Sequence, residues 1–233
     1  MGYTKFDFNS TYVNRTFVSG NIKYSAPNII DGNKKMIETV DRNYGKIIDK
    51  WSKVFDIDKG IIIAFICTES GGTNASRNGA GAIGLMQVTA PTAYEVIAKW
   101  GIQVGVPLSA ETKTFLKSKV SSSSSWNSNR LMTSADKVQI ESALTNTEYN
   151  IAVGTATIRW MIEAFSKIGV GGLDKVMVAY NAGYYGKRNA IKNLTASQLV
   201  DAKDILKFET RAYILKMLGV YGFMDLYYNK MNK

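Results

Sequence analysis

The pattern of apolar and polar positions predicts a protein built mainly of α-helices. Only three prolines interrupt the chain, and helix-capping residues precede several apolar stretches, at Asp58, Ser109, Ser134 and Thr147. The predicted helices cover residues 59–67, 93–100, 110–120, 135–144, 147–167, 173–180, 196–207 and 209–218. Strand-like alternation is weak and confined to the first 25 residues. We therefore predict a mainly α fold.

Two segments depart from this pattern and are interpreted as additions. Residues 1–40 are rich in Asn, Ser and Thr, and we expect them to be irregular. Residues 101–146 contain a run of serines at 121–125, which predicts a flexible loop. The predicted organisation is an N-terminal extension over residues 1–40 and one domain over residues 41–233, with an insertion at about 101–146.

The residue content excludes several kinds of chemistry. The 233 residues include no histidine and one cysteine, Cys67. A Ser-His-Asp or Cys-His catalytic site, a metal site with histidine ligands and an internal disulfide are therefore excluded. Cys67 stands in an apolar run and is interpreted as a core residue. We expect no cofactor and no metal, which leaves carboxylate chemistry, lysine chemistry or binding.

The formal net charge of +10 favours polyanionic partners: nucleic acid, anionic lipid or the polymers of a bacterial wall. The positive charges are dispersed and are not clustered with aromatic residues, so we do not expect nucleic-acid binding. No apolar run approaches the ~20 residues of a membrane span. The first residues also lack the apolar stretch of a secretory signal, so export is expected by another route or after removal of a signal.

A glycine-rich stretch at 79–84 has the spacing G-x-G-x-x-G, which invites a nucleotide-binding interpretation. A dinucleotide-binding loop follows a strand and has an acidic residue about 20 positions on, whereas this one follows a polar loop and has Lys99 there. A calcium loop starting at Asp56 also fails, because its twelfth position is Cys67. The stretch is therefore assigned to neither function.

Glu69 stands just before this loop, at the end of a helix that is apolar on every side and is therefore expected in the core. Burial and the negative end of the helix dipole both disfavour the carboxylate and raise its pKa. A raised pKa suits a general acid near neutral pH. On these features alone, an exposed glutamate in a polar loop is an equally good interpretation.

Five short motifs occur in order: ES at 69–70, GAIGLMQV at 81–88, NIAVG at 150–154, AYNAG at 179–183 and ETRAY at 209–213. Together they resemble the catalytic domain of soluble lytic transglycosylases, which are relatives of goose-type lysozyme. The resemblance runs from about residue 41 to residue 218, interrupted by the insertion. It implies a lysozyme-like helical fold and glycan strands of peptidoglycan as the partner.

The resemblance also implies a reaction. The family cleaves the β-1,4 bond between N-acetylmuramic acid and N-acetylglucosamine without adding water, and the C6 hydroxyl of the muramoyl sugar attacks its own C1. Glu69 matches the glutamate that acts first as acid and then as base. Ordinary glycosidases use two carboxylates, but the next acid after Glu69 is Glu95, on a predicted helix beyond the loop. A nucleophile within the substrate, at high effective molarity, removes the need for a second carboxylate.

Further roles are implied residue by residue. Ser70 follows the acid and is expected to fix the loop. Met86 and Gln87 match the floor of the sugar-binding groove, and the Gln87 amide is expected to bond the sugars. Where many relatives carry serine, nine residues after the catalytic glutamate, this sequence has Asn78, which can also donate and accept hydrogen bonds.

The later motifs supply the remaining candidates. Tyr180 matches the family tyrosine whose hydroxyl reaches the catalytic carboxyl, and Asn181 is expected to line the groove. Glu209 matches an acid at the end of the groove, and Tyr213 is expected to pack behind it.

Two other functions are compatible with the same fold. A hydrolysing lysozyme would use water as nucleophile and would need a second base, for which Glu209 is available. A non-catalytic virion or wall-binding protein would keep the fold without activity, although an intact Glu69 argues against it. The missing signal and the added N-terminal segment favour a phage or mobile-element protein, associated with the virion or released at lysis, that acts in the bacterial wall or periplasm. We expect a phage particle or a secretion or conjugation machine to contact residues 1–40.

Overall fold

The computed structural model describes residues 18–19, 22–23, 27–74, 78–79, 81–100 and 132–231. Within them the chain is mainly helical, as the sequence predicts. It divides into two compact units, unit 1 with Met1–Gly72 and Ile158–Lys233, and unit 2 with Thr73–Thr157. The insertion helix predicted at 110–120 and the serine run at 121–125 lie outside the described residues.

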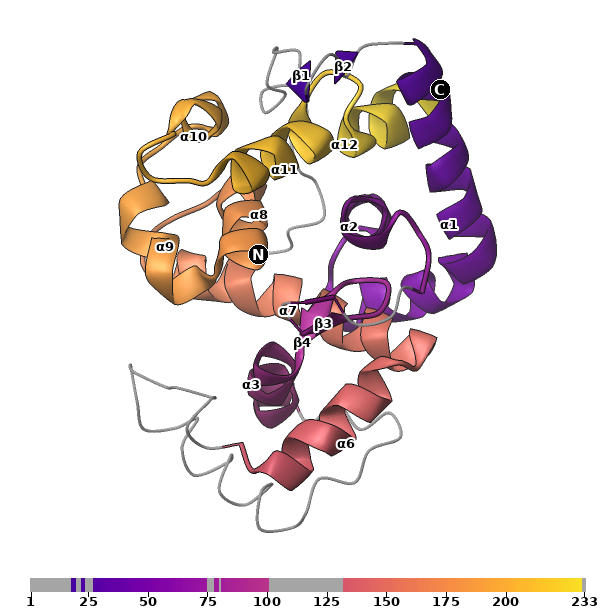
Figure 1. Cartoon of the computed structure of the whole chain (residues 1–233), viewed down its shortest axis with the longest axis vertical. Helices are drawn as coiled ribbons and strands as arrows, with labels where there is room; N and C mark the ends of the chain where they lie inside the picture. Colours follow the sequence, from indigo (N-terminus) through magenta and orange to yellow (C-terminus); the bar gives the residue numbers. More distant parts are fainter. Residues whose placement is uncertain are drawn as a thin grey trace. The chain divides into compact units, whose positions relative to one another are not determined.

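Unit 1 holds most of the helices (Figure 1). Its elements are β1 (Val18–Ser19), β2 (Ile22–Lys23), α1 (Pro27–Phe55), α2 (Lys59–Ser70), α8 (Leu173–Ala182), α9 (Tyr184–Ile191), α10 (Ala196–Asp201), α11 (Phe208–Leu218), α12 (Phe223–Asp225) and the π-helical turn η2 (Leu226–Met231). The strands β1 and β2 pair antiparallel. Unit 2 contains β3 (Ala82–Ile83), β4 (Val88–Thr89), α3 (Ala90–Trp100), α6 (Ser134–Leu144) and the first part of α7 (Thr147–Ser166), whose end belongs to unit 1.

Helix α2 is the buried centre of unit 1. Asp58 caps its first turn by accepting a hydrogen bond from the Gly60 amide at 2.8 Å, as predicted. Its body from Gly60 to Cys67 is buried, and α1, α11 and α12 pack against it (Figure 1). Gly71, with a φ of 64°, ends the helix in the left-handed conformation that glycine adopts without steric cost. The apolar sequence therefore forms a core helix whose last turn carries Glu69.

The prediction of an irregular segment up to residue 40 is wrong from Pro27 onward, because α1 begins there. Its apolar side chains recur at helical spacing and are buried: Ile37, Val40, Ile48, Trp51 and Phe55. This apolar stripe buries against α2 and outweighs the polar composition of the segment. The helical spacing of these apolar residues is the sequence signal that indicates α1.

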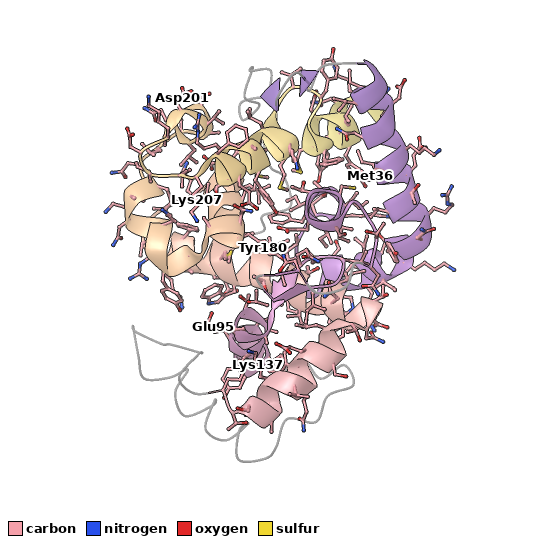
Figure 2. All side chains as sticks on the ribbon, viewed as in Figure 1. Met36, Glu95, Lys137, Tyr180, Asp201 and Lys207 are labelled. Carbon is pink, nitrogen blue, oxygen red and sulfur yellow. The ribbon has the colours of Figure 1, made fainter. Side chains whose placement is uncertain are left out.

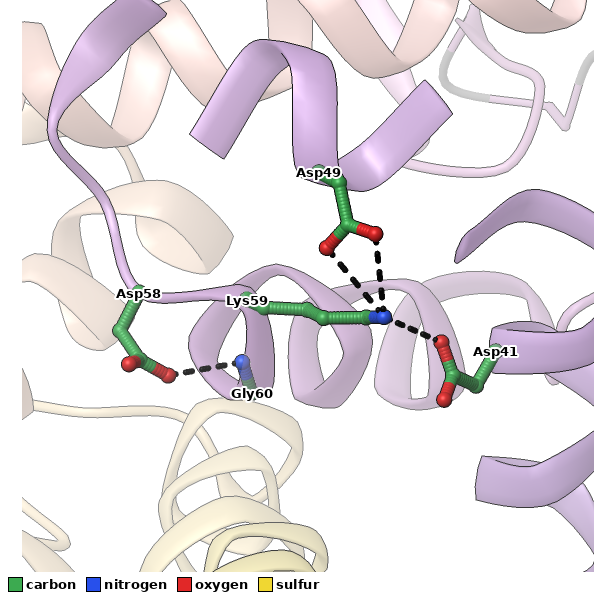
Figure 3. A network of polar contacts seen from close by, with 5 residues as sticks. All are labelled: Asp41, Asp49, Asp58, Lys59 and Gly60. Carbon is green, nitrogen blue, oxygen red and sulfur yellow. Dashed lines mark hydrogen bonds and ion pairs between the residues drawn. The ribbon is translucent and has the colours of Figure 1, made fainter. Parts of the chain in front are cut away.

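A polar network fastens the start of α2 to α1 (Figure 3). The Lys59 ammonium lies 2.8 Å from an Asp41 oxygen and 3.2 Å from an Asp49 oxygen. Burial alone would lower the pKa of Lys59, but the two carboxylates outweigh it and raise the pKa. Because the network is partly exposed, it fixes the relative position of the two helices more than it adds stability.

Two other sequence predictions need correction, and one helix was not predicted. The cap of α6 is Thr133 and not Ser134, because Thr133 and Asp136 form a reciprocal capping box. Helix α10 ends at Asp201 and not at residue 207, because the chain turns directly after Asp201. The sequence analysis did not predict α9, whose eight residues begin directly after Gly183.

Candidate active site

Glu69 lies in the last turn of α2, with its side chain partly exposed at the edge of the core. The Tyr213 hydroxyl donates a hydrogen bond to its Oε1 at 2.7 Å, although 144 residues separate the two. Tyr213 comes from α11 and is 5% exposed. One carboxylate oxygen is thus held by a buried donor, which fixes the orientation of the carboxyl.

Aromatic rings from three helices surround this carboxyl. Phe65, one turn before Glu69, makes edge contacts with Tyr180 at 4.9 Å and with Tyr213 at 6.3 Å between ring centroids. Tyr180 lies on the side of α8 that faces α2 (Figure 2). Burial and the nearby Glu69 charge raise the pKa of both tyrosines well above the usual value, so both keep their protons. They can therefore act as hydrogen-bond donors at any ordinary pH.

One face of α11 carries the electrostatics of the site. Glu209, Tyr213 and Lys216 follow one another at helical spacing (i, i+4, i+7) and all act on Glu69. Burial raises the pKa of Glu69 to about 7, the Tyr213 hydrogen bond opposes the rise, Glu209 adds to it and Lys216 opposes it. Burial, one of the two causes that the sequence argument named, is the dominant one.

This environment suits one carboxyl for both directions of proton transfer. With a pKa near 7, Glu69 is protonated in part of the molecules at neutral pH and ionised in the rest. General acid–base catalysis is most efficient when the pKa lies close to the operating pH. Glu69 can therefore give a proton to a leaving oxygen and take one from an attacking hydroxyl.

Other candidates in unit 1 have identified partners. The Ser70 hydroxyl donates to the Ile66 carbonyl at 3.1 Å, which ties it to its own helix. Asn181, at the end of α8, accepts a hydrogen bond from the Thr210 hydroxyl of α11 at 2.7 Å. Glu209 is exposed at the start of α11. The structure therefore brings Glu69, Tyr180 and Tyr213 together. Asn181 links α8 to α11 through its hydrogen bond with Thr210.

The structure gives Tyr213 a different place from the expected one. The resemblance put the Tyr180 hydroxyl on the catalytic carboxyl and Tyr213 behind Glu209. In the structure the Tyr213 hydroxyl donates to Glu69, and Tyr180 contacts Phe65 and lies within electrostatic range of Glu69. The difference follows from the register of α11, which turns Tyr213 toward α2.

The glycine-rich loop belongs to unit 2 and forms the short β3–β4 hairpin. Asn78 closes its first turn, since its amide donates to the Ala82 carbonyl at 2.9 Å and its side chain accepts from the Ala82 amide at 3.0 Å. Gln87 has a φ of 46°, unusual for a non-glycine residue, and its side chain donates to the Gly84 carbonyl at 2.8 Å. Met86 is fully buried. The loop is therefore a fixed backbone shape.

Asn150 in α7 holds that shape, and the sequence analysis gave it no role. Its side chain accepts from the Met86 amide at 2.8 Å and donates to the carbonyls of Ile83 at 2.8 Å and Leu144 at 2.9 Å, all without solvent exposure. One turn on, a Cβ at Gly154 would lie 2.4 Å from the Met86 sulfur. The NIAVG motif is thus a support for the loop. An asparagine among the apolar residues of a predicted helix is the sequence signal that points to such a supporting role.

Lys216 was also missed, and no sequence signal distinguished it from the other surface lysines. Its effect on Glu69 depends on the register of α11 against α2.

Among the residues that the structure describes, no group of three or more His, Cys, Asp or Glu side chains could hold a metal ion. Over the same residues, no helix is both long enough and apolar enough to cross a membrane.

Comparisons with known proteins give a family match and a structural neighbour. Residues 46–105 match the family described as the transglycosylase SLT domain. No curated protein matches the sequence significantly. A solved structure, an inactive mutant of lytic transglycosylase Slt from Pseudomonas aeruginosa, matches 81% of this chain with a TM-score of 0.55 and 22% identity. This chain spans only 24% of that protein. The resemblance to the soluble lytic transglycosylase family is thus confirmed, and the chain has the mainly α, lysozyme-like fold of a lytic transglycosylase.

Proposed function

We propose that this protein is a peptidoglycan lytic transglycosylase that cleaves the β-1,4 bond between N-acetylmuramic acid and N-acetylglucosamine. The observation that carries the proposal is the Glu69 carboxyl, oriented by Tyr213 at 2.7 Å and with its pKa raised by burial to about 7. The match to the transglycosylase SLT domain includes Glu69 and the glycine-rich loop. The other site residues, from Tyr180 onward, lie outside that match and rest on geometry.

Glu69 acts twice in the proposed reaction. It first donates its proton to the glycosidic oxygen, and the bond from that oxygen to C1 of the muramoyl sugar breaks. The C6 hydroxyl of the same sugar then bonds to C1, and the Glu69 carboxylate takes the hydroxyl proton. The products are a 1,6-anhydro end and a free hydroxyl end, and Glu69 is protonated again. No water is consumed and the carboxyl returns to its starting state.

The surrounding residues position this chemistry. Tyr213 orients the carboxyl, and the protonated Tyr180 donates to the sugar or to the carboxyl as charge develops. Asn181, held by Thr210, and Glu209 bind the glycan at the α8–α11 side. For Gln87 and Asn78 of unit 2, the proposed glycan contacts rest on the motif match alone, and Met86 is buried beneath the loop that carries them. Ser70 keeps the end of α2 in place.

A hydrolysing muramidase is the alternative that the site itself offers. Glu209 is exposed and within electrostatic range of Glu69, so it could activate a water molecule. Mass spectrometry of fragments released from purified sacculi separates the alternatives. A transglycosylase gives muropeptides lighter by one water than those of a muramidase. Release of the heavier products would contradict the proposal, and release of neither would support a non-catalytic protein. The Glu69→Gln variant is the blank for both measurements.

A further inference from the structure

A cluster of aromatic rings and a guanidinium group lies where α9 meets α7 in unit 1. Trp160 of α7 is 5.4 Å from Tyr184 and 6.0 Å from Tyr185 between ring centroids. The two tyrosines are 5.3 Å apart. The Arg188 guanidinium carbon lies 5.5 Å from the Tyr184 centroid and 5.8 Å from that of Tyr185. We call Trp160, Tyr185 and Arg188 the α7–α9 platform.

The two neighbouring tyrosines are used differently. Tyr184 is 5% exposed, contacts Phe165 at 5.0 Å and donates its hydroxyl to the Ala164 carbonyl at 3.2 Å. It is a structural anchor between α9 and α7. Tyr185 is 48% exposed, one of few large apolar side chains with so much surface among the described residues. Tyr185 therefore belongs to the same ring cluster but leaves about half of its side chain accessible to a ligand.

The platform has the chemistry to hold a sugar ring. The negative face of an aromatic ring attracts groups with a positive edge, and one side of a pyranose ring presents such C–H groups. Trp160 and Tyr184 fix the plane of the Tyr185 ring from the sides, so little side-chain freedom is lost on binding. Arg188, placed over the rings, offers planar donors to hydroxyl, acetamido or carboxylate oxygens at the edge of such a sugar.

The platform also lies close to the candidate catalytic residues along the chain. Tyr180 faces Glu69 from α8, and Tyr185 is five residues further on, past the turn at Gly183. Five residues span at most about 18 Å even when fully extended. A polymer bound at Glu69 therefore extends to within reach of Tyr185 if it runs along the α8–α9 side.

We propose that Trp160, Tyr185 and Arg188 form a glycan subsite that binds one pyranose ring of the peptidoglycan strand away from the bond that is cleaved. This inference rests on the proposed function, because it takes the same polymer as ligand. The platform contributes affinity for long strands and leaves the chemical step at Glu69 unchanged.

The test uses the full chain with Glu69→Gln, so that ligands stay intact. Affinity for neutral chitooligosaccharides of increasing length is measured by calorimetry, and affinity for sacculi by pelleting. We expect Tyr185→Ala to weaken binding of the long oligosaccharides by about three- to tenfold, the size of one aromatic contact, and to leave the short ones unaffected. Tyr185→Phe keeps the ring and should bind normally. Arg188→Lys keeps the charge but loses the planar fork, and should weaken binding to a smaller degree.

The matched control is Lys192→Ala, which removes a positive charge at the end of the same helix but outside the ring cluster. Equal losses from Arg188→Ala and Lys192→Ala, seen only with sacculi, would mean that charge alone acts there, and would overturn the subsite. Unchanged affinity for long oligosaccharides in Tyr185→Ala would overturn it too. Failure of the proposed function is seen separately, as the absence of anhydro products from the chain with intact Glu69.

Discussion

The surroundings of Glu69 in unit 1 and the glycine-rich loop in unit 2 are built on opposite principles. Around Glu69, burial sets the proton affinity of the carboxyl first, and Tyr213, Glu209 and Lys216 adjust it. In the loop, one uncharged side chain, Asn150, sets a backbone path through three buried hydrogen bonds. The first region thus controls the protonation of a carboxyl, and the second controls the conformation of a backbone segment. Substitutions should therefore alter pH dependence in one and stability in the other.

The largest expected effect is on catalysis. Glu69→Gln keeps the shape of the side chain and can still accept the Tyr213 hydrogen bond, but it carries no transferable proton. General acid–base catalysis contributes about 10²–10⁴-fold, so we expect a rate loss of that order. Clearing of a sacculus suspension measures it, with circular dichroism as the folding control. If the variant keeps more than about a tenth of the normal rate, Glu69 is not the general acid and base.

The next effect is on the stability of the loop. Asn150→Ala leaves the Met86 amide and the carbonyls of Ile83 and Leu144 without their partner, and each buried group costs about 1–3 kcal/mol. We expect the free energy of unfolding to fall by about 3–5 kcal/mol in urea titrations. The exposed Asn146, which accepts one bond from the Tyr149 amide, is the matched control, and Asn146→Ala should cost about 1 kcal/mol. Equal losses would refute the special role of Asn150.

A smaller effect links Glu69 to stability. Its pKa is raised from 4.5 to about 7, so between these values the folded state binds the proton more tightly than the unfolded state does. Stability should therefore fall as pH rises through this window, by on the order of 1–3 kcal/mol. Glu69→Gln should be more stable than the unmodified chain above about pH 7 and equal to it below about pH 4.5.

Thermal unfolding at two pH values tests this. The exposed Glu38 of α1 supplies the control, because Glu38→Gln also removes a negative charge. If Glu38→Gln stabilises the chain as much as Glu69→Gln at high pH, the effect is one of net charge and not of burial.

The smallest effects separate the two charges on α11. Burial raises the pKa of Glu69 most, and the Tyr213 hydrogen bond lowers it. Of the two charges, Glu209 raises this pKa and Lys216 lowers it. Loss of activity on the alkaline side reports this pKa, because the first step needs the protonated acid. Lys216→Met should move that limb to higher pH and Glu209→Gln should move it to lower pH, in initial rates on a soluble glycan. Shifts in the same direction would mean that the two residues act through structure rather than charge.

Part of the fold was readable from the sequence because local signals decide it. The apolar run over 60–67 and the Asp58 cap predicted α2 and the burial that raises the pKa of Glu69. The start of α1 was lost because polar composition was given more weight than the spacing of Ile37 and Val40. For α10, the sequence up to residue 207 has helical spacing, but the helix ends at Asp201 and the chain leaves it at Ala202.

The details of the site could not be read locally, because they depend on register between distant helices. Tyr213 reaches Glu69 across 144 residues, and only the packing of α11 on α2 decides that it does. The same packing assigns Lys216 its effect. Conversely, Asn150 was visible as part of a motif, but its three partners lie on the loop and at the end of α6. The roles of Gln87, Asn78 and Asn181, the domain limits and a contact between residues 1–40 and a phage or secretion machine stay predictions.

The alkylation rate of the single cysteine can report how often the helix that carries Glu69 opens. Cys67 lies two residues before Glu69, is 4% exposed, and burial raises the pKa of its thiol far above the usual value. An alkylating reagent needs the thiolate, so it reacts only when α2 opens and exposes the sulfur. The labelling rate therefore measures how often the last turn of α2 leaves the core, without any engineered probe. A bound glycan that contacts Glu69 should slow this labelling, which gives a way to follow substrate binding in a chain that performs no turnover.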